Sequence, residues 1–112
     1  MENLLKETLE SLDDNNKKTT DIIFIGAESG YSCSWEEFTV LANKEYNSDF
    51  GTAHVADDLI IVFTNGSRLV RGEYDGSEWW KYIENFKMPE ELKPIKSLFQ
   101  FKCERLLAEI NS

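Results

Sequence analysis

Residues 58–84, DLIIVFTNGSRLVRGEYDGSEWWKYIE, decide the fold of this chain. The run at 59–63 is apolar on both faces of a strand, which predicts a central strand that is covered on two sides. Asn65-Gly66 and Asp75-Gly76 each fit the central positions of a type I′ turn, where both residues need a positive φ. The sequence therefore predicts a three-stranded antiparallel meander over residues 58–84.

Two-residue turns at both positions would fix the register of these strands. In the first hairpin, Ile61 would face Val70 and Ile60 would face Arg71. In the second hairpin, Arg71 would face Trp80, and a guanidinium–indole contact can form between them. Gly72 would face Trp79, whose ring would cover the glycine. Glu73 would face Glu78. The last pair is a like-charge pair that a three-residue second turn would avoid, so the register remains open.

Helices are predicted before the meander. An N-terminal helix at 2–12 would bury Leu5, Leu9 and Leu12 on one face, because these residues are spaced by whole helical turns. A middle helix would begin after Ser34, which fits a capping box with Glu37, and would run to about residue 46. A buried strand is predicted between these helices, at residues 21–25.

A C-terminal helix is predicted after Pro94, a residue suited to the first helical turn. Its apolar stripe would consist of Ile95, Leu98, Phe99, Cys103, Leu106, Leu107 and Ile110. The order of elements is then α-β-α-β-β-β-α. We therefore expect a single α+β domain over residues 1–112, with an antiparallel sheet of about four strands packed against N-terminal, middle and C-terminal helices.

Composition argues against several classes of protein. The chain has 112 residues with 21 acidic and 12 basic side chains, a formal charge of −9. Proteins that follow the phosphates of nucleic acid neutralise them with lysine and arginine, so direct nucleic-acid binding is not expected. No apolar run approaches the roughly 20 residues of a membrane span, and the first residues lack the basic and apolar regions of a signal peptide. We therefore expect a cytoplasmic protein that does not associate with membranes.

Two cysteines and one histidine limit the chemistry of the chain. Cys33 and Cys103, at unrelated positions, are typical of a reduced cytosolic protein. With His54 alone they cannot supply four zinc ligands, so no metal and no cofactor is expected. Cys33 lies next to the cap of the middle helix, and with His54 as its base it would make a small cysteine-dependent hydrolase, the third functional hypothesis.

The negative charge is unevenly distributed along the chain. Residues 1–78 carry 16 acidic and 6 basic side chains, whereas residues 79–112 are nearly neutral. Either this charge only keeps the protein soluble, or it forms a surface for a basic groove on another protein. The candidate carboxylates of such a surface are Glu36, Glu37, Asp49, Asp57, Asp58, Glu73, Asp75 and Glu78.

Aromatic side chains are candidate anchors for the same contact. Neighbouring residues of a strand point to opposite faces, so the sheet separates Trp79 from Trp80. If helices cover both faces, both tryptophans are core. Otherwise Trp80 joins Tyr82 and Arg71 in an exposed patch with the composition of interface hot spots. Phe101 projects away from the apolar stripe of the C-terminal helix and is a further candidate anchor.

Three segments resemble small acidic proteins that phages and prophages of low-GC Gram-positive bacteria encode: YSCSWEEF at 31–38, DLIIVF at 58–63 and EYDGSEWW at 73–80. The resemblance spans about residues 22–82 and carries no assigned activity. It implies a small accessory protein of a mobile element. Acidic proteins of that class often inhibit host nucleic-acid enzymes, CRISPR effectors included, by occupying a basic site, which is an analogy between classes for this chain.

The leading hypothesis is a non-enzymatic phage or prophage protein that acts in the host bacterial cytosol. It would bind the basic groove of a host nucleic-acid-handling protein as a nucleic-acid mimic and inhibit it, as an anti-CRISPR would. The alternative is a homo-oligomeric structural or assembly protein of a phage. Such a protein would associate, as a homodimer for example, through an aromatic sheet face or Phe101.

Overall fold

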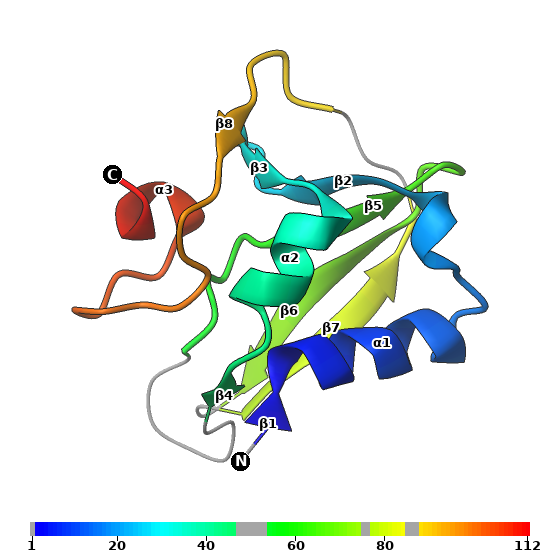
Figure 1. Cartoon of the computed structure of the whole chain (residues 1–112), viewed down its shortest axis with the longest axis horizontal. Coiled ribbons are helices and arrows are strands. Elements are labelled where there is room, and N and C mark those ends of the chain that lie inside the picture. Colours follow the sequence, from blue (N-terminus) through cyan, green and yellow to red (C-terminus); the bar gives the residue numbers. More distant parts are fainter. Residues whose placement is uncertain (1, 47–53, 75–76, 85–87) are drawn as a thin grey trace.

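A mixed sheet of six strands forms the centre of the fold (Figure 1). The computed structural model describes residues 2–46, 54–74, 77–84 and 88–112. The strand order is β7-β6-β5-β2-β3-β8, and all neighbours are antiparallel except β3 and β8, which are parallel. The strands are β2 (Ile22–Gly26), β3 (Tyr31–Cys33), β5 (Ile60–Phe63), β6 (Arg68–Tyr74), β7 (Ser77–Ile83) and β8 (Lys93–Pro94).

Two further strands, a 3₁₀ turn and three helices complete the architecture. β1 (Glu2–Asn3) pairs with β4 (Glu45–Tyr46) in a separate antiparallel sheet, and η1 (Thr19–Asp21) leads into β2. α1 (Leu4–Asp14) and α2 (Trp35–Leu41) lie over one face of the large sheet, and α3 (Leu107–Ile110) lies on its β3–β8 side (Figure 1).

The expected α+β class is confirmed, and the four predicted strands are antiparallel neighbours in the order β7-β6-β5-β2, but the sheet has six strands and is mixed. After β7 the chain returns to the opposite edge of the sheet and adds β8 alongside β3, where the two strands run parallel. Within the described parts of the chain, no helix is long and apolar enough to span a membrane.

The meander of β5, β6 and β7 is confirmed, and its second hairpin has the predicted register. Arg71 faces Trp80, Gly72 faces Trp79, and Glu73 faces Glu78. The indole of Trp79 covers Gly72 so closely that a Cβ built on the glycine would lie 2.5 Å from the ring. A larger residue at this position would therefore displace the Trp79 ring.

The first hairpin is shifted by one residue from the prediction. The pairs are Ile60 with Val70 and Ile61 with Leu69, so the predicted pairs of Ile61 with Val70 and Ile60 with Arg71 are wrong. The loop has three residues, closed by a hydrogen bond from Phe63 N–H to Ser67 O (2.9 Å) and by Gly66 at a φ of +87°. This register places one small apolar cluster on the face away from α1 and α2: Phe24, Ile60, Val62 and Val70.

The first two helices form close to where they are predicted. α1 buries Leu4, Thr8 and Leu12, whereas Leu9, expected in its apolar face, is 46% exposed. The capping box of α2 is confirmed, because Glu37 N–H donates to Ser34 Oγ (3.0 Å) and Ser34 N–H donates to Glu37 Oε1 (2.9 Å). α2 ends at Leu41, so residue 46 belongs to β4 and not to the helix.

The predicted C-terminal helix is wrong except for its last turn, α3. Residues 95–106 are held by long-range hydrogen bonds: Ala56 N–H donates to Leu98 O (3.0 Å), and Gln100 N–H donates to His54 O (2.9 Å). These bonds satisfy backbone groups that a helix would have paired locally. Cys103, expected in a buried stripe, is exposed and has a φ of +66°.

Candidate functional site

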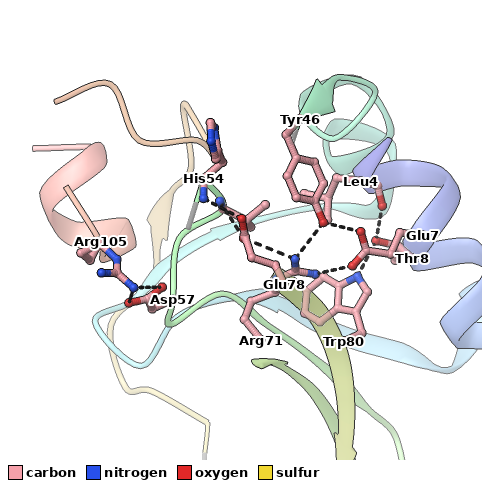
Figure 2. A network of polar contacts seen from close by, with 11 residues as sticks. Leu4, Glu7, Thr8, Tyr46, His54, Asp57, Arg71, Glu78, Trp80 and Arg105 are labelled. Atoms are coloured by element: carbon pink, nitrogen blue, oxygen red, sulfur yellow. Dashed lines mark hydrogen bonds and ion pairs between the residues drawn. The ribbon is translucent and has the colours of Figure 1, made fainter. Parts of the chain in front are cut away.

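A buried arginine joins α1, β4 and β7 to β6 (Figure 2). The side chain of Arg71 is 3% exposed. Its Nη1 donates to Glu7 Oε1 on α1 (2.8 Å), and its Nη2 donates to the hydroxyl of Tyr46 on β4 (3.0 Å). The guanidinium also lies 4.7 Å from the centroid of the Trp80 ring. The predicted guanidinium–indole contact is thus confirmed, but it is in the interior.

Glu78 ties the same cluster to the segment that leads into β5. Its side chain is 2% exposed, and Oε1 lies 3.5 Å from Arg71 Nη2. Its oxygens also accept hydrogen bonds from the backbone N–H groups of His54 (2.6 Å) and Val55 (3.0 Å) (Figure 2). These donors compensate the buried charge, which explains why the pairing of Glu73 with Glu78 is tolerated.

Proton positions in this network follow from burial and charge. Burial alone would lower the pKa of Arg71, but Glu7 and the Tyr46 hydroxyl raise it above its usual value, so the guanidinium stays charged. Burial raises the pKa of Tyr46, and the phenol keeps its proton and donates it to Glu7 Oε2. The network therefore consists of a cation held between acceptors.

Trp80 fixes α1 on the sheet from the other side of this cluster. Its Nε1 donates to Thr8 Oγ1 (2.9 Å), and the Thr8 hydroxyl in turn donates to Leu4 O (2.7 Å) (Figure 2). Trp80 is 8% exposed and Thr8 is completely buried. The register of α1 against β7 is therefore set by hydrogen bonds as well as by apolar packing.

Three of the predicted partner-binding residues thus lie inside the molecule. The side chains of Arg71, Glu78 and Trp80 contact one another or α1. They therefore do not form the exposed patch that was one of the two predictions. Arginine and glutamate are mostly exposed in proteins, and their burial here depends on partners that are distant in the sequence. These residues position the surface above them.

Carboxylates gather on both sides of α1. A groove of about 250 Å³ between α1 and β7 is lined by Glu2, Glu7, Glu10, Ser11, Asp14, Glu78, Trp79 and Trp80. A second hollow of about 370 Å³ is lined by Glu2, Asn3, Lys6, Glu7, Glu10 and Glu45. The two hollows share three glutamates and form a continuous negative region. We call it the α1 acidic surface, made of Glu2, Glu7, Glu10, Asp14 and Glu45.

The carboxylates predicted from the sequence lie on separate elements. Asp57, before β5, forms an ion pair with Arg105 (Oδ2–Nη2 3.0 Å). Asp58 Oδ1 accepts a hydrogen bond from Leu107 N–H at the start of α3 (2.7 Å), and burial raises the pKa of Asp58. These two aspartates therefore hold the C-terminal segment.

The other predicted carboxylates within the described residues lie on α2 and β6. Glu36 and Glu37 are exposed in the first turn of α2, where Glu37 serves the capping box. Glu73 is exposed near the end of β6. Asp49 and Asp75 lie outside the described residues.

The predicted aromatic anchors differ in exposure. Phe101 is 87% exposed and Tyr82 is 36% exposed. The Tyr82 ring lies beside Phe63 (centroids 6.5 Å apart), and Lys17 Nζ is 5.7 Å from its centroid. Trp79, on the face opposite Trp80, is 41% exposed and borders the groove beside α1. The Trp79 ring therefore lies on the face of the sheet away from α1, where it packs over Gly72.

The thiol chemistry proposed for Cys33 is disfavoured. Burial, with a smaller effect of Glu37, raises the pKa of Cys33 to about 12, so the thiol stays protonated at neutral pH. The ring of His54 packs near Tyr46 (centroids 6.5 Å apart), and among the described residues no contact joins it to Cys33. Across the same residues, no cluster of three or more His, Cys, Asp or Glu side chains has the arrangement of a metal site.

Sequence reasoning missed the α1 acidic surface, although a signal for it exists. Glu7, Glu10 and Asp14 are spaced i, i+3 and i+7, which places them on one face of a helix. The remaining members, Glu2 and Glu45, are brought together by the pairing of β1 with β4, which no local pattern indicates. Comparisons of the chain with protein-family models, with curated proteins and with solved structures gave no match.

Proposed function

We propose that this protein is a non-catalytic phage or prophage accessory protein that inhibits a host nucleic-acid-handling protein in the bacterial cytosol. The α1 acidic surface would occupy a basic groove that otherwise holds nucleic acid, as in an anti-defence factor of the anti-CRISPR kind. One observation carries the proposal: carboxylates line the groove between α1 and β7, and neither lysine nor arginine is among its lining residues.

Electrostatics supports this mode of binding. Carboxylates that outnumber the cations around them attract a lysine- and arginine-rich surface, which accelerates association and disfavours acidic partners. The buried network below holds the groove in place, because Arg71 binds Glu7 and Trp80 binds Thr8. A surface that is held rigid before binding loses less entropy when a partner docks.

The proposal is tested by capture from a bacterial host lysate with the tagged protein. The test variant is Glu10→Gln/Asp14→Asn, and its control is Glu28→Gln/Glu90→Gln, which removes the same charge from exposed positions elsewhere. Capture is compared at about 0.1 M and about 1 M salt, where the Debye length falls from about 10 Å to about 3 Å.

We expect the wild type and the control to retain a basic nucleic-acid-binding protein at low salt only. Glu10→Gln/Asp14→Asn should not retain this protein. Added nucleic acid should displace the captured protein from the wild type. A partner that Glu10→Gln/Asp14→Asn retains equally, or that is retained equally at high salt, would contradict the proposal.

A homo-oligomeric structural or assembly protein is the second candidate. It is supported by the exposure of Phe101 (87%) and Leu106 (43%) near the C-terminus. Sedimentation over a broad range of concentrations tests it. An association that Phe101→Ser abolishes would favour this function, and a strict monomer would argue against it.

A further inference from the structure

The two edges of the large sheet are protected to different degrees. β8 is an edge of two residues that contains a proline, so it offers little backbone for pairing. β7 is an edge of seven residues with no proline, and in the described part of the chain no strand pairs with its outer side. Strand edges of this length are templates for the addition of another strand.

The direction of the backbone groups on β6 follows from one hydrogen bond. Phe63 N–H donates to Ser67 O (2.9 Å), so the polar backbone groups of Ser67 point toward β5. Along an antiparallel strand these groups alternate in direction from residue to residue. Those of Arg68, Val70 and Gly72 therefore point toward β7.

The same alternation identifies the backbone groups of β7 that point away from β6. Trp79 and Lys81 face Gly72 and Val70 on β6, so their backbone groups are directed inward, toward that strand. The N–H and C=O groups of the residues between and beside them point to the open edge. These residues are Glu78, Trp80 and Tyr82.

The surroundings of this edge differ on the two faces of the sheet. On the α1 side, the groove presents Glu10 and Asp14, both exposed, above the edge. On the other side lies Trp79, 41% exposed and packed over Gly72. A strand that paired with β7 would therefore direct alternate side chains toward carboxylates and toward an indole.

We propose that β7 accepts an extended segment of a partner protein as an additional strand, with basic residues alternating with apolar ones. The basic side chains would reach the carboxylates of α1, and the apolar ones would pack beside Trp79. The inference rests on the proposed function for the sign of the partner's charge, and it adds how the partner binds. Repulsion also disfavours pairing of β7 with β7 of a second copy of this chain, because such pairing would bring Glu10 and Asp14 of both copies together.

Hydrogen exchange of the wild-type protein tests the mode of binding directly. The probe is a capped peptide of about seven residues, alternating lysine and valine, which matches the length of β7. Its control carries glutamate in place of lysine. With the lysine peptide at about ten times its Kd, exchange of the Glu78, Trp80 and Tyr82 amides should slow roughly tenfold, because only unbound molecules exchange there. The Trp79 and Lys81 amides should change little, and the glutamate peptide should protect none of them.

A pair of variants tests the same edge by affinity. Tyr82→Pro removes an outward N–H at a position where an edge strand tolerates proline, and Tyr82→Ala removes the same ring but keeps the N–H. Urea unfolding first establishes that both variants fold. The lysine peptide should then bind Tyr82→Pro about tenfold more weakly than Tyr82→Ala. Equal affinities would overturn the proposal.

The outcomes separate this inference from the proposed function. If the lysine peptide binds without the alternating protection on β7, strand addition is wrong, although docking of a basic groove on α1 can still be correct. If the alternating protection occurs and Glu10→Gln/Asp14→Asn binds both peptides like the wild type, the assigned basic partner is wrong. If Glu78, Trp80 and Tyr82 are already protected in a dimer without peptide, a second copy is the occupant and the proposal is overturned.

Discussion

Two pairs of carboxylates lie at α1 and β7, one inside the fold and one outside it. Glu7 and Glu78 have side chains that are 15% and 2% exposed, and both contact Arg71. Glu10 and Asp14 are exposed along the groove. The inner charges are bound to fixed donors inside the fold, whereas we propose that the outer charges attract a partner. The position of each carboxylate, and not the total of −9, therefore decides its function.

The largest expected effect is at the centre of the inner pair. Arg71→Met leaves two carboxylates with little exposure and without their cation, which should lower the free energy of unfolding by about 3–5 kcal/mol. Lys81→Met, which also replaces a cation by methionine but at an exposed position of the neighbouring strand, should alter it by about 0.5 kcal/mol or less. Urea unfolding followed by circular dichroism measures both. Similar losses in the two variants would mean that the inner network does not hold the fold.

The neighbouring tryptophans give a smaller effect of the same kind. Trp80→Phe removes the hydrogen bond to Thr8 in the buried region and should cost about 1–3 kcal/mol of stability. Trp79→Phe, on the exposed side, should cost about 1 kcal/mol or less. Thermal unfolding of both variants measures the difference, and a reversed order would show that the inside and outside of β7 are wrongly assigned.

The two cysteines extend the comparison to reactivity. With a thiol-specific disulfide reagent near pH 8, the exposed Cys103 should be labelled rapidly, and Cys33 only when the protein is unfolded. The pKa of Cys33 is raised from 9.0 to about 12, so the unfolded chain loses this proton first as the pH rises. Ionisation of Cys33 should therefore lower stability progressively between pH 9 and about 12, a loss that Cys33→Ala would lack. Rapid labelling of Cys33 in the native protein would contradict the expected protection of this thiol, and an equal loss of stability in Cys33→Ala would contradict the pH prediction.

Local signals were sufficient for much of the fold. The hairpin signals predict the meander, the Ser34 capping box predicts the start of α2, and the pairing of Arg71 with Trp80 follows from the second turn. The register of the first hairpin was wrong because Gly66 closes a three-residue loop, which the same Asn-Gly signal does not distinguish from a two-residue turn. The long C-terminal helix was predicted wrongly because hydrogen bonds to distant segments replace the local bonds of a helix.

The candidate site was less accessible to sequence reasoning. Burial of Arg71 depends on Glu7 and Tyr46, which are 64 and 25 residues away in the chain, and no periodicity reports such contacts. The spacing of Glu7, Glu10 and Asp14 does predict one acidic helix face. That this face borders an open strand edge follows only from the tertiary structure.

The central claim is that the inner carboxylates stabilise the fold and the outer carboxylates bind a partner. Stability and peptide affinity, both measured on Glu10→Gln/Asp14→Asn, test this claim most directly. We predict that its free energy of unfolding stays within about 0.5 kcal/mol of the wild-type value. At low salt, its affinity for the alternating lysine–valine peptide should fall at least about threefold, because two exposed charges that face the peptide are removed. A loss of stability comparable to that of Arg71→Met, or an unchanged affinity for the peptide, would contradict the assignment of these carboxylates to binding.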